Sequence, residues 1–197
     1  MFDRERVDMA KHLVGALAIA GVALVTSVGM APSAGVHAAS NLVKMSNPGY
    51  SLMVPNTWKY DNKFPTSQMF KSPSLQHLTP TSAIFFTADN TDAVGVVVMN
   101  GAASTSVIKS LESKIIRDDT KLQNAISYQT VSQHGASFVI AAARVTVSGK
   151  TVGEAVAAAT HAGKTYYFLA SIQIGSSAKL KADGNEVTAV LDSITVH

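Results

Sequence analysis

Beyond residue 40 the chain alternates between apolar and polar side chains in short runs, a spacing typical of half-buried strands. Residues 50–54 alternate in this way, and residues 58–61 and 83–87 predict two further strands. The run 94–99 is apolar on both faces, which predicts a strand at the centre of a sheet. Residues 126–131, 136–147, 151–160 and 165–174 then predict four strands joined mainly by tight glycine turns, an antiparallel meander.

Residues 104–117 place apolar side chains at the spacing of one helical face, and Ser104 or Ser106 is a suitable cap for the helix start. The expected apolar stripe consists of Val107, Ile108, Leu111 and Ile115. The charged residues Lys109, Glu112 and Lys114 are expected to lie mostly off it.

A second helix is predicted near the C-terminus, opened by Asp183 or an earlier residue. Its apolar stripe consists of Val187, Val190, Leu191 and Ile194. Residues 40–48 are interpreted as a short leading segment, and 63–81, which contain several prolines, as an irregular surface loop. Because a half-apolar sheet needs a cover that the two helices can supply, these elements predict an α+β fold.

The first forty residues have a different character. An uncharged apolar run covers residues 13–28, and Val36 and Ala38 satisfy the small-residue rule for cleavage after Ala38. The interpretation is a signal peptide at 1–38, with Met1 or Met9 as the start, followed by one domain at 39–197. Extended to Ala31, the run approaches the length of a membrane span, so an uncleaved anchor remains an alternative. Both interpretations predict an extracytoplasmic domain, secreted or associated with the envelope.

Composition narrows the classes of function. The formal net charge is +3, and the basic residues are scattered singly, so a nucleic-acid partner is not expected. The chain has no cysteine, which excludes a lipid anchor on an N-terminal cysteine, disulfide bonds, thiol catalysis and cysteine-based zinc sites. A domain of this length can form a core without a metal or a disulfide.

Two short motifs carry a resemblance to a known family. The segment Gly49-Tyr-Ser-Leu-Met-Val-Pro-Asn-Thr-Trp58 is similar to the opening of the PsbP-like superfamily. The segment Val187-Thr-Ala-Val-Leu-Asp-Ser-Ile194 resembles its last helix, which often closes with Leu-x-Ser followed by an apolar residue. The resemblance implies an α/β/α sandwich, with a central antiparallel sheet flanked by helices. It also implies a binding or scaffolding role, since most members of that diverse superfamily are not enzymes.

No motif predicts a catalytic residue, a metal site or a cofactor. His77, His134 and His161 lack the paired spacing of metal ligands. Two Ser-x-x-Lys matches, Ser106–Lys109 and Ser176–Lys179, lack the companion motifs of serine enzymes that use them. The oxygens of Asp89, Asn90 and Asp92 suit calcium, but turn chemistry explains those residues more simply.

The aromatic side chains Trp58, Tyr60, Phe64 and Phe70, with Met69 beside them, are the candidate ligand-binding residues. The alternative for these residues is that they cover a sheet edge or the underside of the loop. The leading hypothesis is an exported, non-catalytic binding or scaffold domain for a protein partner or a small apolar ligand. A cryptic serine hydrolase that uses Ser106 and Lys109 and a membrane-tethered structural envelope protein are the alternatives.

Overall fold

A computed structural model describes residues 41–76, 81–87, 92–118, 120–174 and 178–197. The predicted signal peptide lies outside these residues, so its cleavage and the domain boundary remain predictions. The centre of the described structure is an antiparallel eight-stranded sheet in the order β3-β4-β5-β10-β9-β8-β6, with β7 also paired to β8. Its strands are β3 (Lys59–Pro65), β4 (Thr81–Phe86), β5 (Asp92–Asn100), β6 (Lys121–Leu122), β7 (Ser127–Gln133), β8 (Ala136–Val147), β9 (Lys150–His161) and β10 (Lys164–Gln173).

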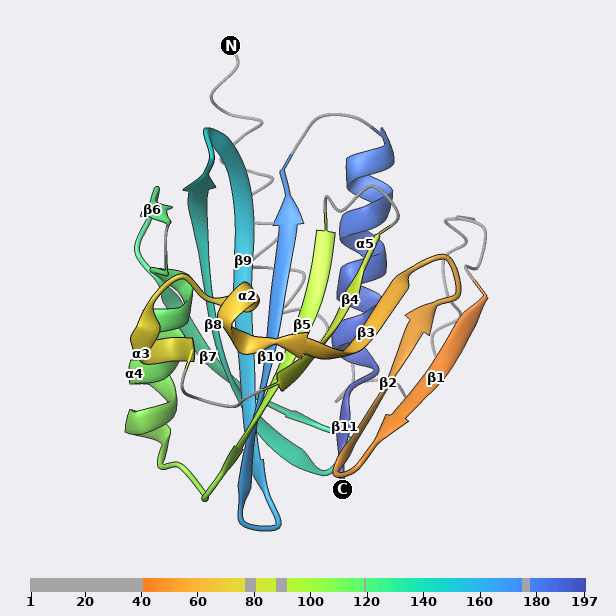
Figure 1. Ribbon diagram of the computed structural model, residues 1–197, viewed down its shortest axis with the longest axis vertical. Helices are drawn as coiled ribbons and strands as arrows, with labels where there is room; N and C mark the ends of the chain where they lie inside the picture. The colour runs from red at the N-terminus through yellow and green to blue at the C-terminus, as the bar shows by residue number, and fades with distance from the viewer. Residues whose placement is uncertain (1–40, 77–80, 88–91, 119, 175–177) are drawn as a thin grey trace, which may run out of the picture.

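Helices cover both faces of this sheet (Figure 1). The first face carries helix α5 together with a small three-stranded sheet, and the second carries helix α4 with two short helices. The covering elements are β1 (Leu42–Asn47), β2 (Tyr50–Pro55), β11 (Thr195–Val196), α2 (Thr66–Met69), α3 (Pro73–Gln76), α4 (Thr105–Ile116) and α5 (Ala178–Asp192). This arrangement confirms the predicted α/β/α sandwich. None of the described helices has the length and apolar character needed to cross a bilayer.

Strand β10 shows how one run of residues supplies both halves of the core. Successive side chains of a strand point to opposite faces, so Tyr166 and Phe168 pack beneath α5 while Tyr167 packs beneath α4. All three side chains are fully buried. Burial of an aromatic side chain of this size contributes about 1.5–3 kcal/mol, so the central strand stabilises both layers at once.

The predicted meander is confirmed, and its turns have a common geometry. Three hairpins connect β7 to β8, β8 to β9 and β9 to β10, and both central residues of each turn have positive φ. The pairs are His134–Gly135, Ser148–Gly149 and Ala162–Gly163. This geometry is that of the type I′ turn, whose twist matches that of the flanking strands. The glycine at the second position therefore fixes the register of the meander.

Several expectations were wrong in detail. Residues 40–48 contain strand β1, which pairs with β2 along its whole length, and the loop at 63–81 contains the end of β3, α2, α3 and the start of β4. In α4, Ser104 caps the helix as predicted, but Val107 is 54% exposed. Glu112, expected on the polar side, is 0% exposed. The face of α4 that packs on the sheet consists of residues 108, 112, 115 and 116. This spacing places the Glu112 carboxyl in the middle of the buried stripe.

The two motifs behind the family resemblance lie next to each other in the structure. The hydroxyl oxygen of Ser193, just after α5, accepts the N–H of Met53 in β2 at 2.7 Å. Gly49, in the β1–β2 turn, has a φ of +92°, and a Cβ there would overlap the Tyr166 hydroxyl. Only glycine combines that backbone conformation with so close an approach. The motifs thus fix the small sheet to the end of α5 and to β10.

Candidate functional site

The structure separates the four predicted ligand residues instead of gathering them. Trp58 is 8% exposed in the core beneath α5, where its indole N–H donates to Glu186 Oε2 at 2.9 Å. Phe70 is 3% exposed in the core on the opposite face of the sheet. Tyr60 is 37% exposed and stacks on Phe85, with ring centroids 4.6 Å apart, and Phe64 is half-buried near the end of β3. Their role in binding remains a prediction.

Phe70 and its neighbour Met69 do line a cavity of about 240 Å³ on the α4 face, which we name the α2 pocket. Strands β4, β5, β9 and β10 form its other walls, together with the end of α4. The walls are mainly apolar, and the polar groups at the pocket are few. The lining residues used below are Met69, Phe70, Asp118, Glu154 and Ser171.

Asp118, two residues beyond α4, holds the wall formed by α2 and α3 in place. Its two carboxylate oxygens accept the backbone N–H groups of Lys71 at 2.6 Å and Ser72 at 2.8 Å. Hydrogen bonds from N–H groups to a carboxylate are stronger than those between neutral groups. Gln76 adds a hydrogen bond from its side-chain amide to the carbonyl of Phe70 at 3.0 Å. The short helices, which have little intrinsic stability, are therefore anchored next to the pocket.

Glu154 is the second carboxyl group at the pocket. It lies on β9, where its cross-strand neighbours are Ala143 and Ser171, neither of which carries a charge. Among the described residues its carboxylate has no hydrogen bond and no ion pair. Burial raises its pKa to about 7, and the negative charge of Asp118 adds to that effect. A carboxyl in this state gains most from a cation, which would favour its ionised form.

The residues considered for catalysis have other contacts. The Ser106 hydroxyl lies 3.0 Å from that of Ser104, and the Lys109 ammonium lies 5.4 Å from the centroid of the Tyr128 ring. These contacts do not favour the serine hydrolase alternative. Ser176, the serine of the second Ser-x-x-Lys match, lies outside the described residues.

Two of the residues considered as metal ligands make other contacts in the described structure, and a third is exposed. His134 Nε2 lies 3.0 Å from the carbonyl oxygen of Asp192, and His161 is exposed at the end of β9. Asp92 accepts the N–H of Gln173 at 2.7 Å and so joins β5 to the end of β10. His77, Asp89 and Asn90 fall outside the described residues, within which no three acidic or histidine side chains cluster to hold a metal.

Comparison with known proteins identifies the fold. No family model and no curated protein matches the chain. The solution structure of cyanobacterial PsbP (CyanoP) from Synechocystis sp. PCC 6803 matches with a TM-score of 0.53 and 16% identity, covering 85% of this chain and 99% of that one. LpqN, involved in cell envelope biogenesis of Mycobacterium tuberculosis, matches with a TM-score of 0.48 and 14% identity. The match covers 79% of this chain and 91% of LpqN. A Bacteroides thetaiotaomicron protein matches with a TM-score of 0.46 and 12% identity. The match covers 75% of this chain and 45% of that protein.

The chain therefore has a PsbP-like fold, as the two sequence motifs predicted. At this identity the likeness concerns the fold alone, and any function has to be argued from the site.

Proposed function

We propose that this chain is an exported, non-catalytic binding domain whose α2 pocket takes a small apolar ligand with a cationic group. The observation that carries the proposal is Glu154, an unpaired carboxyl among apolar walls. An ammonium group placed there would pair with the carboxylate, while the apolar part of the ligand would contact Met69 and Phe70. A cavity of about 240 Å³ is smaller than the roughly 300–1,000 Å³ of drug-sized ligand sites, so it suits only a small ligand.

Export is supported by the apolar run at 13–28 and by the small residues Val36 and Ala38 before the proposed cleavage site. A non-catalytic role is supported by the contacts of Ser106 and Lys109, which engage both side chains elsewhere. In the α2 pocket Ser171 lies opposite Glu154 on the neighbouring strand, but no hydrogen bond joins the two side chains, and none of the described residues that line the pocket is a histidine or a lysine.

The test compares benzylamine with benzyl alcohol, which has the same ring but no charge. We expect the amine to bind the folded protein at pH 8, with chemical-shift changes confined to amides around the α2 pocket, and the alcohol to bind more weakly. Because Glu154 has a pKa of about 7 and must be ionised, affinity for the amine should fall about tenfold between pH 8 and pH 6.

Two matched variants locate the effect. Glu154→Gln should remove the preference for the amine over the alcohol. Glu112→Gln, which replaces a buried carboxyl of α4 on the same side of the sheet but outside the pocket, should retain it. Equal affinity of the wild-type protein for the two compounds would overturn the proposal, as would a preference that survives Glu154→Gln.

A further inference from the structure

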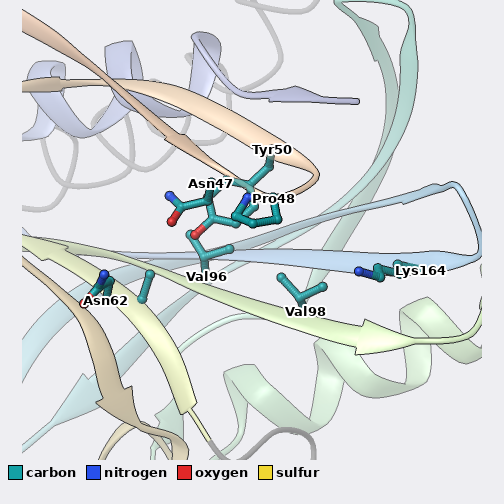
Figure 2. A pocket seen from close by; sticks show the side chains of 8 residues that line it. Asn47, Pro48, Tyr50, Asn62, Val96, Val98 and Lys164 are labelled. Carbon is teal, nitrogen blue, oxygen red and sulfur yellow. The ribbon is translucent and has the colours of Figure 1, made fainter.

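The opposite face of the sheet carries a second cavity, of about 270 Å³, between the β1–β2 turn and strands β3, β4, β5 and β10. We propose that this hairpin pocket binds a small apolar carboxylate. Figure 2 shows the side chains around it: Asn47, Pro48 and Tyr50 come from the end of β1, the turn and the start of β2, Asn62 comes from β3, and Lys164 comes from the start of β10. The site is separate from the α2 pocket and differs from it in charge.

The floor of the hairpin pocket is apolar and belongs to the core beneath α5. It consists of Ala83, Val96 and Val98, from the two adjacent strands β4 and β5, and the ring of Tyr50. Tyr50 is held by edge-to-face contact with Tyr166, at 6.2 Å between ring centroids and an interplanar angle of 64°. A surface of this kind suits a hydrocarbon group and offers nothing to a bare inorganic anion.

The side chain of Asn47 provides an unused hydrogen-bond donor beside this floor. Its Oδ1 accepts the hydroxyl of Tyr60 at 3.3 Å, which leaves the amide nitrogen as the free end of the group. That nitrogen, Nδ2, is buried and has no hydrogen-bond partner among the described residues. A buried donor without an acceptor is unfavourable, and a ligand oxygen that reached Nδ2 after rotation of the Asn47 side chain toward the pocket would supply the missing hydrogen bond.

The charge around the pocket determines which acceptor fits. Lys164 is exposed, and its ammonium end lies toward Val98 (Figure 2). None of the described residues that line the pocket is acidic. Asp61, the nearest carboxylate along β3, accepts the N–H of Lys63 at 2.8 Å. A positive charge and a free N–H donor around an apolar floor are complementary to a carboxylate on a short hydrocarbon chain.

An irregularity in β3 completes the rim. The register of the β3–β4 pairing shifts between Asp61 and Phe64, so Asn62 lies in a β-bulge at the edge of the sheet. Bulges are frequent at sheet edges and re-aim a side chain. Here the bulged residue is one that lines the pocket, on the same strand as Tyr60, which orients Asn47.

The experiment titrates the labelled protein with hexanoate, hexan-1-ol and hexylamine, which share a chain and differ in the head group. We expect hexanoate to bind best, with chemical-shift changes at the amides of the β1–β2 turn and the start of β10. Equal binding of hexanoate and hexan-1-ol would overturn the proposal. So would hexanoate shifts located only at the α2 pocket.

Two lysines make a matched pair for this test. Lys164 and Lys150 each follow a two-residue turn with nearly the same positive φ angles and begin a strand, but Lys150 lies at the opposite end of the β9–β10 pair. Both are exposed, so neither substitution should disturb folding. Lys164→Gln should weaken hexanoate binding at least fivefold, and Lys150→Gln should leave it unchanged. If both substitutions weakened binding equally, hexanoate would be attracted only by the overall positive charge, and the proposed site would be wrong.

Discussion

Glu112 offers a test of the packing between α4 and the sheet. Its side chain is 0% exposed, and neither carboxyl oxygen has a hydrogen-bond partner among the described residues. Burial raises its pKa from 4.5 to about 8, an effect only partly offset by Lys109. Within the described residues the buried hydroxyl of Tyr167 also lacks a hydrogen-bond partner, and its pKa is raised to about 12 by burial and by the charge of Glu112. The protein therefore folds with Glu112 protonated at neutral pH.

The effect of this raised pKa on stability follows from the linkage between proton binding and folding. Well below pH 4.5 the Glu112 carboxyl is protonated in both the folded and the unfolded protein, so its titration does not lower the free energy of unfolding. As the pH rises toward 8 the unfolded state loses the proton first, and the free energy of unfolding falls. At about 1.4 kcal/mol per pH unit, the loss at pH 7 reaches at most about 3 kcal/mol. Entry of water next to the charged group would make it smaller.

The assay is urea unfolding of the wild-type protein and Glu112→Gln at pH 5, 7 and 8. We expect the variant to exceed the wild type by less than about 1 kcal/mol at pH 5 and by up to about 3 kcal/mol at pH 7. Glu154 titrates in the same range, but it is present in both proteins and cancels in the difference. A difference in unfolding free energy that is constant from pH 5 to pH 8 would refute the reasoning.

Three further predictions concern other parts of the fold. Gly49→Ala should lower the free energy of unfolding by at least about 2 kcal/mol in urea, because the backbone there has positive φ and a Cβ would overlap the Tyr166 hydroxyl; an unchanged midpoint would contradict the close approach. Gly184→Ala, in α5, should stabilise by about 0.5–1 kcal/mol, since the added Cβ meets only an ordinary contact, and a loss in the same assay would show that it does not fit. Asp118→Asn should speed amide hydrogen exchange in α2 and α3 while leaving β9 and β10 protected, and exchange at the wild-type rate would show that its carboxylate does not anchor them.

The sequence predicted the sheet and its cover because those elements have strong local signals. Two-residue periodicity and the glycines of the three type I′ turns identify the meander. Strand β1 gave no such signal, since Leu42 and Val43 are both exposed and the strand exists through its pairing with β2. The position of Glu112 was missed because charged residues were assigned to the exposed side, although the spacing 108, 112, 115, 116 places it among the buried residues.

The α2 pocket could be predicted only in part. Phe70 was chosen because aromatic side chains suit an apolar ligand, and it lines the pocket together with the neighbouring Met69. Glu154 does leave a signal, as the only acidic residue in the apolar run 151–160, but the run was interpreted as a plain strand. The anchoring role of Asp118 has no local signal, because the amides it binds are 46 and 47 positions away in the sequence.

The pairing of β2 with β11 has a consequence for how the chain is made. Tyr50 pairs with Val196, and the Met53–Ser193 hydrogen bond joins residues 140 positions apart. Closing so long a loop is entropically costly and belongs to the late, slow stage of folding. During synthesis the small sheet cannot be completed until residues 193–196 have left the ribosome. The eight-stranded sheet, whose last strand in sequence ends at Gln173, does not need these residues, so the small sheet is the part of the fold that is completed last during synthesis.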